Sequence, residues 1–155
     1  MIKIDFLKNH PNAIPRLAQI WHELIGRIWT PDIMVTEVEA WMHEWNNQDA
    51  LPLAHVALND NIPVGSCSLQ VNDGIRSDLS PWLGDLCVDP AYQKLGIGQL
   101  LIDATKESAK HLGFDKLYLF AFDSASASYY EQLGWQKIGA DEFKGHPVTV
   151  MEIAL

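Results

Sequence analysis

The first third of the chain combines one alternating pattern with two helical patterns. Residues 2–6 alternate apolar and polar side chains, which predicts a strand. Apolar residues then recur at helical spacing between positions 14 and 28, which predicts an amphipathic helix. A Thr-Pro-Asp sequence at 30–32 ends that helix, and a second amphipathic pattern follows over residues 35–45. We therefore expect one strand followed by two helices.

The middle of the chain has the pattern of a small sheet. Two mainly apolar runs, 53–58 and 62–71, flank a short polar turn, and this arrangement predicts a β-hairpin. Residues 72–81 are expected to form a loop. The largely apolar run 82–88 predicts a third strand, which ends at Pro90 because proline cannot continue a strand ladder.

Helices and strands alternate in the remainder. Five further elements are predicted: a helix over 97–112 that Gly113 closes, a strand over 116–122, a helix over 124–133, and strands over 135–139 and 148–155 joined by an irregular loop through Gly145, His146 and Pro147. The predicted order is strand-helix-helix-strand-strand-strand-helix-strand-helix-strand-strand. It indicates an α/β or α+β fold with a mixed, mostly antiparallel central sheet flanked by helices.

Composition and net charge indicate which kinds of molecule this protein could bind. The 155 residues are 48% hydrophobic and 20% charged, as expected for one globular domain. The net charge of −9 disfavours nucleic acid as a partner and favours a cationic substrate. Two cysteines are too few for a disulfide framework, and no apolar run is long enough to cross a bilayer. We expect a cytoplasmic protein with no membrane partner.

The stretch after the strand at 82–88 carries the most specific chemistry. Gly96 and Gly98 lie where a strand turns into a helix, so backbone N–H groups can close on a bulky anion there. The positive end of the helix dipole and the nearby Lys94 favour a pyrophosphate. A Walker loop is excluded because no Gly-Lys-Ser/Thr sequence is present, and a Rossmann fingerprint would require glycine in place of Leu101. On spacing alone, the glycines could also serve only a tight turn.

Two motifs in this part of the chain resemble one family. The run from Gln93 to Gly98 is similar to the Gln/Arg-x-x-Gly-x-Gly/Ala signature of the GCN5-related N-acetyltransferases (GNAT superfamily). The run from Tyr129 to Trp135 resembles that family's later Tyr-Glu-x-x-Gly-Phe segment, and residues 143–151 also resemble members of it. The resemblance implies one acetyltransferase domain over residues 1–155, with a sheet whose fourth and fifth strands splay apart.

The resemblance also implies acetyl-coenzyme A (acetyl-CoA) as co-substrate. Main-chain groups of the fourth strand would pair with the pantetheine arm as an added strand does. An Asn that helps to bind the arm in the family is replaced here by an aspartate. The cofactor-binding residues expected in this way are Leu86, Cys87, Val88, Gln93, Lys94, Leu95, Gly96, Ile97, Gly98, Gln99, Asp123 and Tyr130.

Two residues are the expected catalytic groups. Tyr130 stands where the family has a tyrosine that protonates the leaving thiolate, although it could also be a core aromatic, and its neighbour Tyr129 is expected to pack. Asp85 is the only acid on the fourth strand, and the two-residue period predicts that it shares a face with Leu83 and Cys87. It could be the general base, or an aspartate that faces solvent or forms hydrogen bonds with a loop.

Other chemistry-bearing residues have less support. The remaining candidates for the base are His22, Glu23, His55 and His146. Cys87 has no activating partner in the sequence and is expected to be a small buried residue rather than a nucleophile. The six histidines lack the spacing of a metal site, so no metal is expected.

The acceptor side is less defined by the sequence. Four of the six tryptophans, Trp21, Trp29, Trp41 and Trp45, precede residue 46, and they either fill the core or line a substrate pocket. The loop at 72–81 could act as a lid, with Asp73 and Asp78 attracting a cation.

The predicted function is acetyl transfer from acetyl-CoA to a primary amine of a small molecule or of a peptide N-terminus, by direct attack. The alternatives are transfer to oxygen or of a longer acyl chain, and a non-catalytic module that senses acyl-CoA. The resemblance also leaves a homodimer open.

Overall fold

Helices and strands follow one another in the predicted order. The computed structural model describes residues 1–155. Its helices are α1 (Ile14–Trp21), α2 (Arg27–Trp29), α3 (Val35–Glu44), α4 (Ile97–His111) and α5 (Ser124–Gln132). Its strands are β1 (Ile2–Phe6), β2 (Leu53–Asn59), β3 (Ile62–Gln70), β4 (Trp82–Val88), β5 (Lys116–Ala121), β6 (Gln136–Phe143) and β7 (His146–Ala154). None of the helices has the length and apolar character needed to cross a membrane.

The helix predicted over 14–28 is not uniform. A wider π turn, His22–Gly26, separates α1 from α2. A Cβ atom at Gly26 would lie 2.8 Å from the Trp21 ring, so this close packing requires glycine. Trp29 follows at the end of α2.

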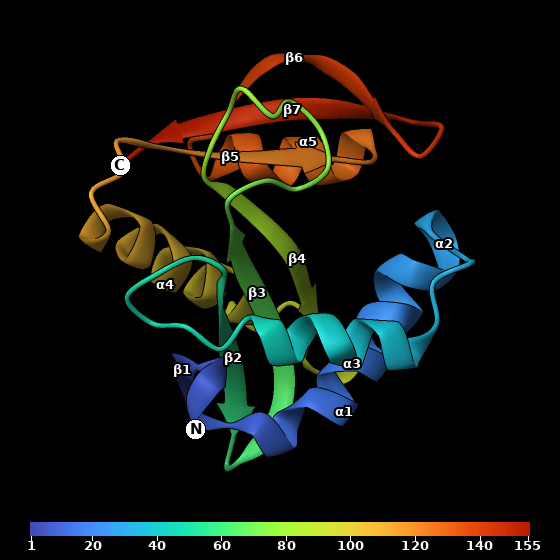
Figure 1. The fold of residues 1–155 in the computed structure, drawn as a ribbon, viewed down its shortest axis with the longest axis vertical. Helices are drawn as coiled ribbons and strands as arrows, with labels where there is room; N and C mark the ends of the chain where they lie inside the picture. Colours follow the sequence, from blue (N-terminus) through green and yellow to red (C-terminus); the bar gives the residue numbers. More distant parts are fainter.

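One seven-stranded sheet joins the two halves of the chain. The strand order is β1-β2-β3-β4-β5-β7-β6, and every neighbouring pair is antiparallel except β4 and β5. β4 and β5 are parallel and pair only at Trp82 and Tyr118. Beyond that point they diverge, so β1 to β4 and the β5-β7-β6 unit form the two arms of an open V (Figure 1). The mixed sheet and the splayed fourth and fifth strands are therefore confirmed.

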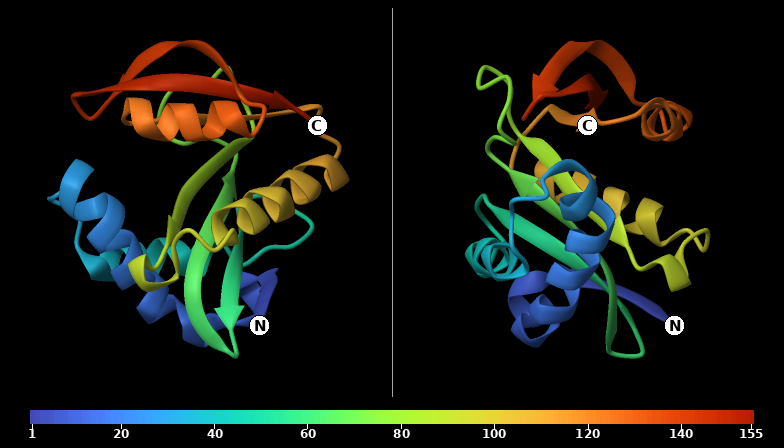
Figure 2. Two further views of the ribbon diagram at one scale, coloured as in Figure 1. Left: turned by 180° about the vertical axis from the view of Figure 1, so that it is seen from behind. Right: turned by 90° about the vertical axis from the view of Figure 1, so that its right-hand side faces the viewer.

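Helices cover both faces of the first arm (Figure 2). On one face α1 and α3 pack through Leu17, Trp21 and Met42 against apolar residues of β2. On the other face α4 packs through Ile97 and Leu101 onto β2, β3 and β4. The helical patterns of α1, α3 and α4 thus correspond to buried stripes, and the two cores hold β4 in place between them.

A β-bulge at Asp85 changes which side chains of β4 share a face. Asp85 and Leu86 together stand opposite the single residue Cys67 of β3. Asp85 has φ of +56°, a left-handed conformation that aspartate tolerates better than most residues. The expectation that Leu83, Asp85 and Cys87 share a face is wrong for Leu83. Because of the extra residue, Leu83 packs in the core beneath α4, whereas Cys87 packs in the core beneath α1 and α3.

The last two strands are longer than predicted and form a tight hairpin. The predicted irregular loop is wrong: Phe143 pairs with His146, and only Lys144 and Gly145 connect them. Both connecting residues have positive φ, +48° and +83°, as two-residue hairpins require. The hydrophobic pattern missed residues 140–143 because β6 is an edge strand whose side chains are mostly exposed.

Candidate active site

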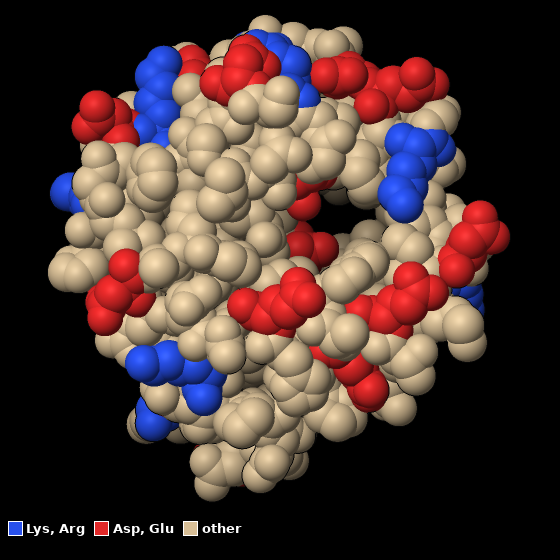
Figure 3. Space-filling view, viewed as in Figure 1, with Lys and Arg blue, Asp and Glu red and all other residues tan.

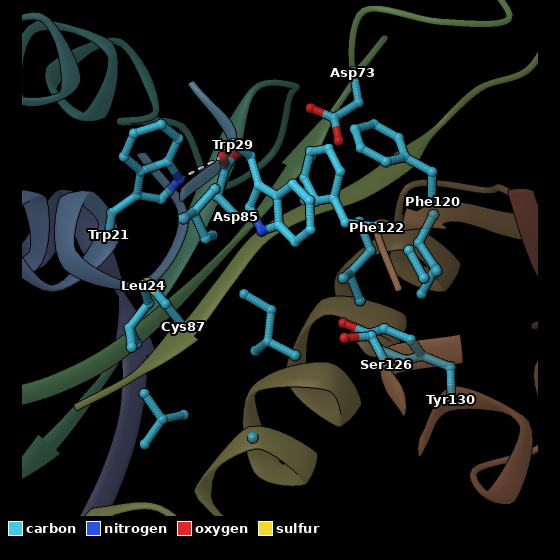
Figure 4. A pocket seen from close by; sticks show the side chains of 18 of the residues that line it. Trp21, Leu24, Trp29, Asp73, Asp85, Cys87, Phe120, Phe122, Ser126 and Tyr130 are labelled. Atoms are coloured by element: carbon cyan, nitrogen blue, oxygen red, sulfur yellow. Dashed lines mark hydrogen bonds between the residues drawn. The ribbon is translucent and has the colours of Figure 1, made fainter. Parts of the chain in front are cut away.

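A cavity of about 1340 Å³ opens where β4 and β5 diverge. Its walls come from the helices α1 to α3, from β4, from the glycine turn with the start of α4, and from β5 with α5. Figure 3 shows a deep opening on this face of the molecule, with acidic side chains on its walls. Figure 4 shows the side chains inside it.

The glycine turn forms one end of the cavity. Gly96 precedes α4 with φ of +84°. The first helical hydrogen bond runs from the N–H of Leu100 to the carbonyl of Gly96 at 3.2 Å, so the N–H groups of residues 97–99 have no acceptor within the helix. These groups and the helix dipole of the 15-residue α4 make this end suited to an anion such as a pyrophosphate.

Space at this end depends on Gly98. A Cβ atom there would lie 3.3 Å from the hydroxyl of Tyr129. Tyr129 lines the cavity and is 41% exposed, so its side chain is not part of the buried core. Among the twelve expected cofactor-binding residues, Leu95 alone is outside the cavity lining, because its side chain is directed to solvent and is 68% exposed.

The segment Leu86–Val88 of β4 forms the floor between the two ends. One of its edges pairs with β3, and the other faces the opening because β5 has turned away. An extended ligand could therefore add to that free edge. The carbonyl of Val88 already accepts a hydrogen bond from Nε2 of Gln93 at 3.0 Å, which ties the strand to the glycine turn. Burial raises the pKa of the Cys87 thiol to about 12, so it is not a thiolate nucleophile.

Asp85 lies on the cavity wall at the bulge. Its Oδ1 accepts a hydrogen bond from Nε1–H of Trp21 at 2.9 Å, and its Oδ2 accepts one from the hydroxyl of Ser68 at 2.7 Å. Burial raises the pKa of Asp85, and the hydrogen bonds from Ser68 and Trp21 offset only part of that rise. The carboxyl is thus held in one orientation with a pKa moved towards neutrality, as a general base requires.

Asp73 is a second carboxyl on the same wall. It belongs to the loop between β3 and β4, and its Oδ2 lies 3.0 Å from the position of a Cβ atom at Gly84. Burial raises its pKa well above the ordinary value, and the neighbouring Asp85 raises it further. Asp78, on the same loop, pairs instead with Arg76 at the surface, 3.0 Å away, and does not line the cavity.

Tyr130 and Asp123 contribute from the side of α5. Tyr130 lines the cavity and packs against the core beneath α4, with its ring centroid 5.9 Å from that of Trp135. Burial raises the pKa of its phenol above the ordinary value, so the phenol is protonated at neutral pH. Asp123 accepts a hydrogen bond from the N–H of Ser126 at 2.7 Å and thereby caps α5, while its side chain also reaches the cavity.

Aromatic rings surround the end of the cavity near Asp73. Trp29 stacks on Phe122 with centroids 4.5 Å apart and planes 5° apart. Phe120 lies 5.1 Å from Phe143, and Phe122 lies 5.4 Å from Phe120. In Figure 4, Trp29, Phe122, Asp73 and Asp85 lie in the upper part of the view, and Ser126 and Tyr130 in the lower part. This end therefore combines carboxylates with apolar ring faces.

The tryptophans of the N-terminal helices lie in the core, on the cavity wall, or in both places. Trp21 is 4% exposed in the core beneath α1 and α3, yet it also lines the cavity and holds Asp85. Trp29, Trp41 and Trp45 line the cavity as well. The alternative candidates for the base, which are His22, Glu23, His55 and His146, lie outside the lining.

Phe120, Phe122 and Glu44 are cavity residues that the sequence analysis did not single out. A signal for two of them was available, because Tyr118, Phe120 and Phe122 alternate along β5 and its end, which places aromatic rings on one face. No comparable signal marks Glu44 at the end of α3.

Comparisons with known proteins agree with this arrangement. A family model described as the acetyltransferase (GNAT) family matches residues 18–135. The chain is 26% identical, over 88 residues, to a protein of Bacillus subtilis (strain 168) whose name places it among the acetyltransferases. That match covers 57% of this chain and 55% of the relative, so the chain spans about half the length of the curated relative it matches.

Solved structures share the whole fold. A ribosomal-protein-alanine N-acetyltransferase from Brucella melitensis has a TM-score of 0.77 at 18% identity, covering 100% of this chain and 99% of its own. A Salmonella typhimurium protein bound to acetyl-CoA has a TM-score of 0.77 at 16% identity, covering 99% and 93%. An aminoglycoside 6′-N-acetyltransferase bound to coenzyme A has a TM-score of 0.74 at 19% identity, covering 99% and 96%. At these identities the structures show a shared fold.

The family match covers most of the chain, including the glycine turn and the whole run from Tyr129 to Trp135. The fold, with its β4 and β5 splayed around the cavity, is that of the solved acetyltransferases. This chain belongs to the acetyltransferase (GNAT) family.

Proposed function

We propose that residues 1–155 act as one domain that transfers an acetyl group from acetyl-CoA to a primary amine of a small molecule or of a peptide N-terminus. The observation that carries this proposal is the position of Asp85, a fixed carboxyl with a raised pKa on the cavity wall between the glycine turn and the aromatic end. Two neighbours are named for amine acceptors, an alanine of ribosomal proteins and an aminoglycoside, and two are bound to acetyl-CoA or coenzyme A.

Binding of acetyl-CoA would use the backbone of this chain. The N–H groups of residues 97–99 would hold the pyrophosphate, and the free edge of Leu86–Val88 would pair with the pantetheine arm. The open space above Gly98, bounded by the Tyr129 hydroxyl, fits this use, because a side chain there would fill it. Side-chain chemistry is then needed only at the reacting end.

Asp85 and Tyr130 would move the protons. The acceptor arrives as an ammonium ion and gives one proton to Asp85, directly or through water, because only the free amine has an electron pair for attack. The nitrogen then bonds to the thioester carbon, and the carbon–sulfur bond breaks. The Tyr130 phenol gives its proton to the leaving thiolate and regains one from the reacting nitrogen or from solvent.

The two buried thiols support a reducing location. Cys67 and Cys87 are both free, and burial raises the pKa of each. We therefore propose the cytoplasm as the compartment.

A thiol-release assay tests the proposal. Purified protein is mixed with acetyl-CoA and a panel of primary amines, and free coenzyme A is followed with a thiol reagent, with matched alcohols and longer acyl-CoA thioesters as separate arms. We expect release that depends on the amine and an acetylated amine by mass spectrometry. Saturable acetyl-CoA binding with no release by any amine would instead identify a non-catalytic acyl-CoA module, and release with alcohols alone would identify O-transfer.

A further inference from the structure

The carboxyl of Asp73 lies close against a glycine on β4. Its Oδ2 lies 3.0 Å from where a Cβ atom of Gly84 would be, and Gly84 directly precedes Asp85. The carboxyl therefore lies over the backbone of β4, close to the proposed base, although Asp73 belongs to the loop that precedes this strand. Asp73 is close enough to Asp85 that the charge of Asp85 disfavours ionisation of Asp73.

The two carboxyls differ in their partners. Both oxygens of Asp85 accept hydrogen bonds from the protein, from Trp21 and Ser68. None of the ion pairs or hydrogen bonds of the structure involves Asp73, although it lines the cavity. An ionised Asp73 thus lacks a counter-charge in a place where burial makes a lone charge unfavourable.

The surroundings of Asp73 favour an organic cation. The rings of Trp29, Phe120 and Phe122 line this part of the cavity, and aromatic faces attract ammonium groups as well as alkyl chains. The lining contains four acidic residues, Glu44, Asp73, Asp85 and Asp123, and two basic residues, Lys94 and Lys144. Lys94 belongs to the glycine turn, and the ammonium of Lys144 lies over the Phe143 ring at 5.8 Å from its centroid.

The reacting amine cannot supply the missing charge. In the proposed reaction it passes its proton to Asp85 and is neutral when it attacks. A cation that stays charged beside Asp73 throughout the reaction would therefore be a second ammonium of the acceptor, and it would favour the ionised form of the Asp73 carboxyl.

We propose that the acceptor is an amine with a second positive charge on an apolar spacer, such as an α,ω-diamine, and that Asp73 binds the second ammonium. This inference rests on the proposed function and names its substrate class. The reacting amine would lie at Asp85, and the spacer would lie along the rings of Trp29 and Phe122. Asp73 is then a specificity-determining residue that takes no part in the proton transfers.

A matched ligand series tests the charge requirement directly. Calorimetry of the protein saturated with coenzyme A compares 1,5-diaminopentane with 5-amino-1-pentanol, pentylamine and 5-aminopentanoic acid. The first two differ only in whether an ammonium or a hydroxyl ends the spacer. We expect the diamine to bind about 10- to 100-fold more tightly than the amino alcohol, since a charge-assisted hydrogen bond replaces a neutral one. Spacers of roughly three to eight carbons then locate the best length.

Three variants assign the effect to Asp73. Asp73→Asn should remove the difference between diamine and amino alcohol. Asp78→Asn is the control, because Asp78 is on the same loop but lies outside the cavity and pairs with Arg76. Gly84→Ala should reduce the difference, because its methyl group would force the Asp73 carboxyl to move by a few tenths of an ångström without changing the charge of the chain.

The outcomes separate this inference from the proposed function. Equal binding of diamine and amino alcohol, or a preference that survives in Asp73→Asn, overturns the inference. Thiol release by all the amines at equal kcat/KM upholds the proposed function and also overturns the inference. Preferential diamine binding that needs Asp73, without thiol release by any amine, upholds the inference on ligand charge and contradicts the proposed function.

Discussion

The two ends of the cavity are built from different parts of the chain. At the glycine turn, the groups available to a ligand are backbone N–H groups of one continuous segment, residues 97–99. At the aromatic end they are side chains from α2, the loop before β4, β4 and β5 with its following residue. A backbone site suits a co-substrate that a whole family shares, because it tolerates many side chains. A site of converging side chains can change its ligand by single substitutions.

The largest effect is expected at the backbone end. Gly98→Val places a branched side chain where a Cβ atom alone would lie 3.3 Å from the Tyr129 hydroxyl, so it should block the N–H groups and reduce acetyl-CoA affinity by more than about 100-fold. Gly139→Val is the matched control, since nothing lies within 4 Å of a Cβ atom there. Calorimetry gives the affinity, and circular dichroism shows that both variants fold. If a folded Gly98→Val protein binds acetyl-CoA as the wild type does, this turn does not bind the pyrophosphate.

A substitution at Asp85 tests whether this residue is the general base. Asp85→Asn keeps the shape of the side chain but cannot accept a proton, so kcat should fall by about 100- to 10,000-fold with little change in acetyl-CoA affinity. In the wild type, kcat should rise with pH as Asp85 ionises, through a pKa above the ordinary aspartate range. Ser68→Ala removes a hydrogen bond that lowers this pKa, so the rise should move to higher pH. If the pH dependence of kcat is the same in Ser68→Ala as in the wild type, another group is the general base.

A substitution at Tyr130 tests whether its phenol protonates the leaving thiolate. Tyr130→Phe removes only the hydroxyl, and kcat should fall by about 10- to 1000-fold while acetyl-CoA affinity stays nearly unchanged. Tyr129→Phe is a useful comparison, because Tyr129 is the neighbouring tyrosine but its hydroxyl lies at the glycine turn. It should weaken acetyl-CoA binding slightly and leave kcat intact. A fall in kcat for Tyr129→Phe but not for Tyr130→Phe would instead identify Tyr129 as the general acid.

The buried His55 predicts how the stability of the fold that carries both ends of the cavity depends on pH. It is 4% exposed beneath α4, with Nε2 3.2 Å from the Ser108 hydroxyl, and burial lowers its pKa to about 4. The unfolded chain therefore binds a proton below about pH 6.5 that the folded chain binds only near pH 4, so stability falls with falling pH. This group alone should reduce the free energy of unfolding by about 2 kcal/mol between pH 8 and pH 5.

Denaturant titrations of the wild type and of His55→Gln at several pH values measure that contribution. Asp73 and Asp85 act with the opposite sign, because their raised pKa values make the folded chain bind protons more readily. The difference between the two proteins isolates His55. Equal pH dependence in both would show that His55 does not titrate as its burial implies.

The contrast between the two ends also explains what the sequence could predict. The glycine turn is local, so Gly96, Gly98 and the preceding strand are recognisable from their spacing. Element order followed from hydrophobic periods. The periods failed in detail at the exposed edge strand β6, at the π turn before α2 and at the bulge of β4. Residue 85 could be identified as a candidate by its type, but its bulge and its partners Trp21 and Ser68 depend on contacts between distant segments.

The aromatic end could not be predicted as a unit. In the sequence, Asp73 and Asp78 are two aspartates of the same loop with nothing to distinguish them. In the folded chain, Asp73 lies against β4, whereas Asp78 pairs with Arg76 at the surface. The stacking of Trp29 on Phe122 joins residues 93 positions apart. Such contacts have no sequence period, because they arise from the docking of the N-terminal helices near β5.

The most direct test of the account is a calorimetric titration of the wild-type protein with acetyl-CoA, followed by free coenzyme A. The account predicts saturable binding of one molecule per chain for both, since both carry the pyrophosphate that the glycine turn would hold. No binding to the folded protein would contradict it, and would reduce the glycine turn to a connection between β4 and α4.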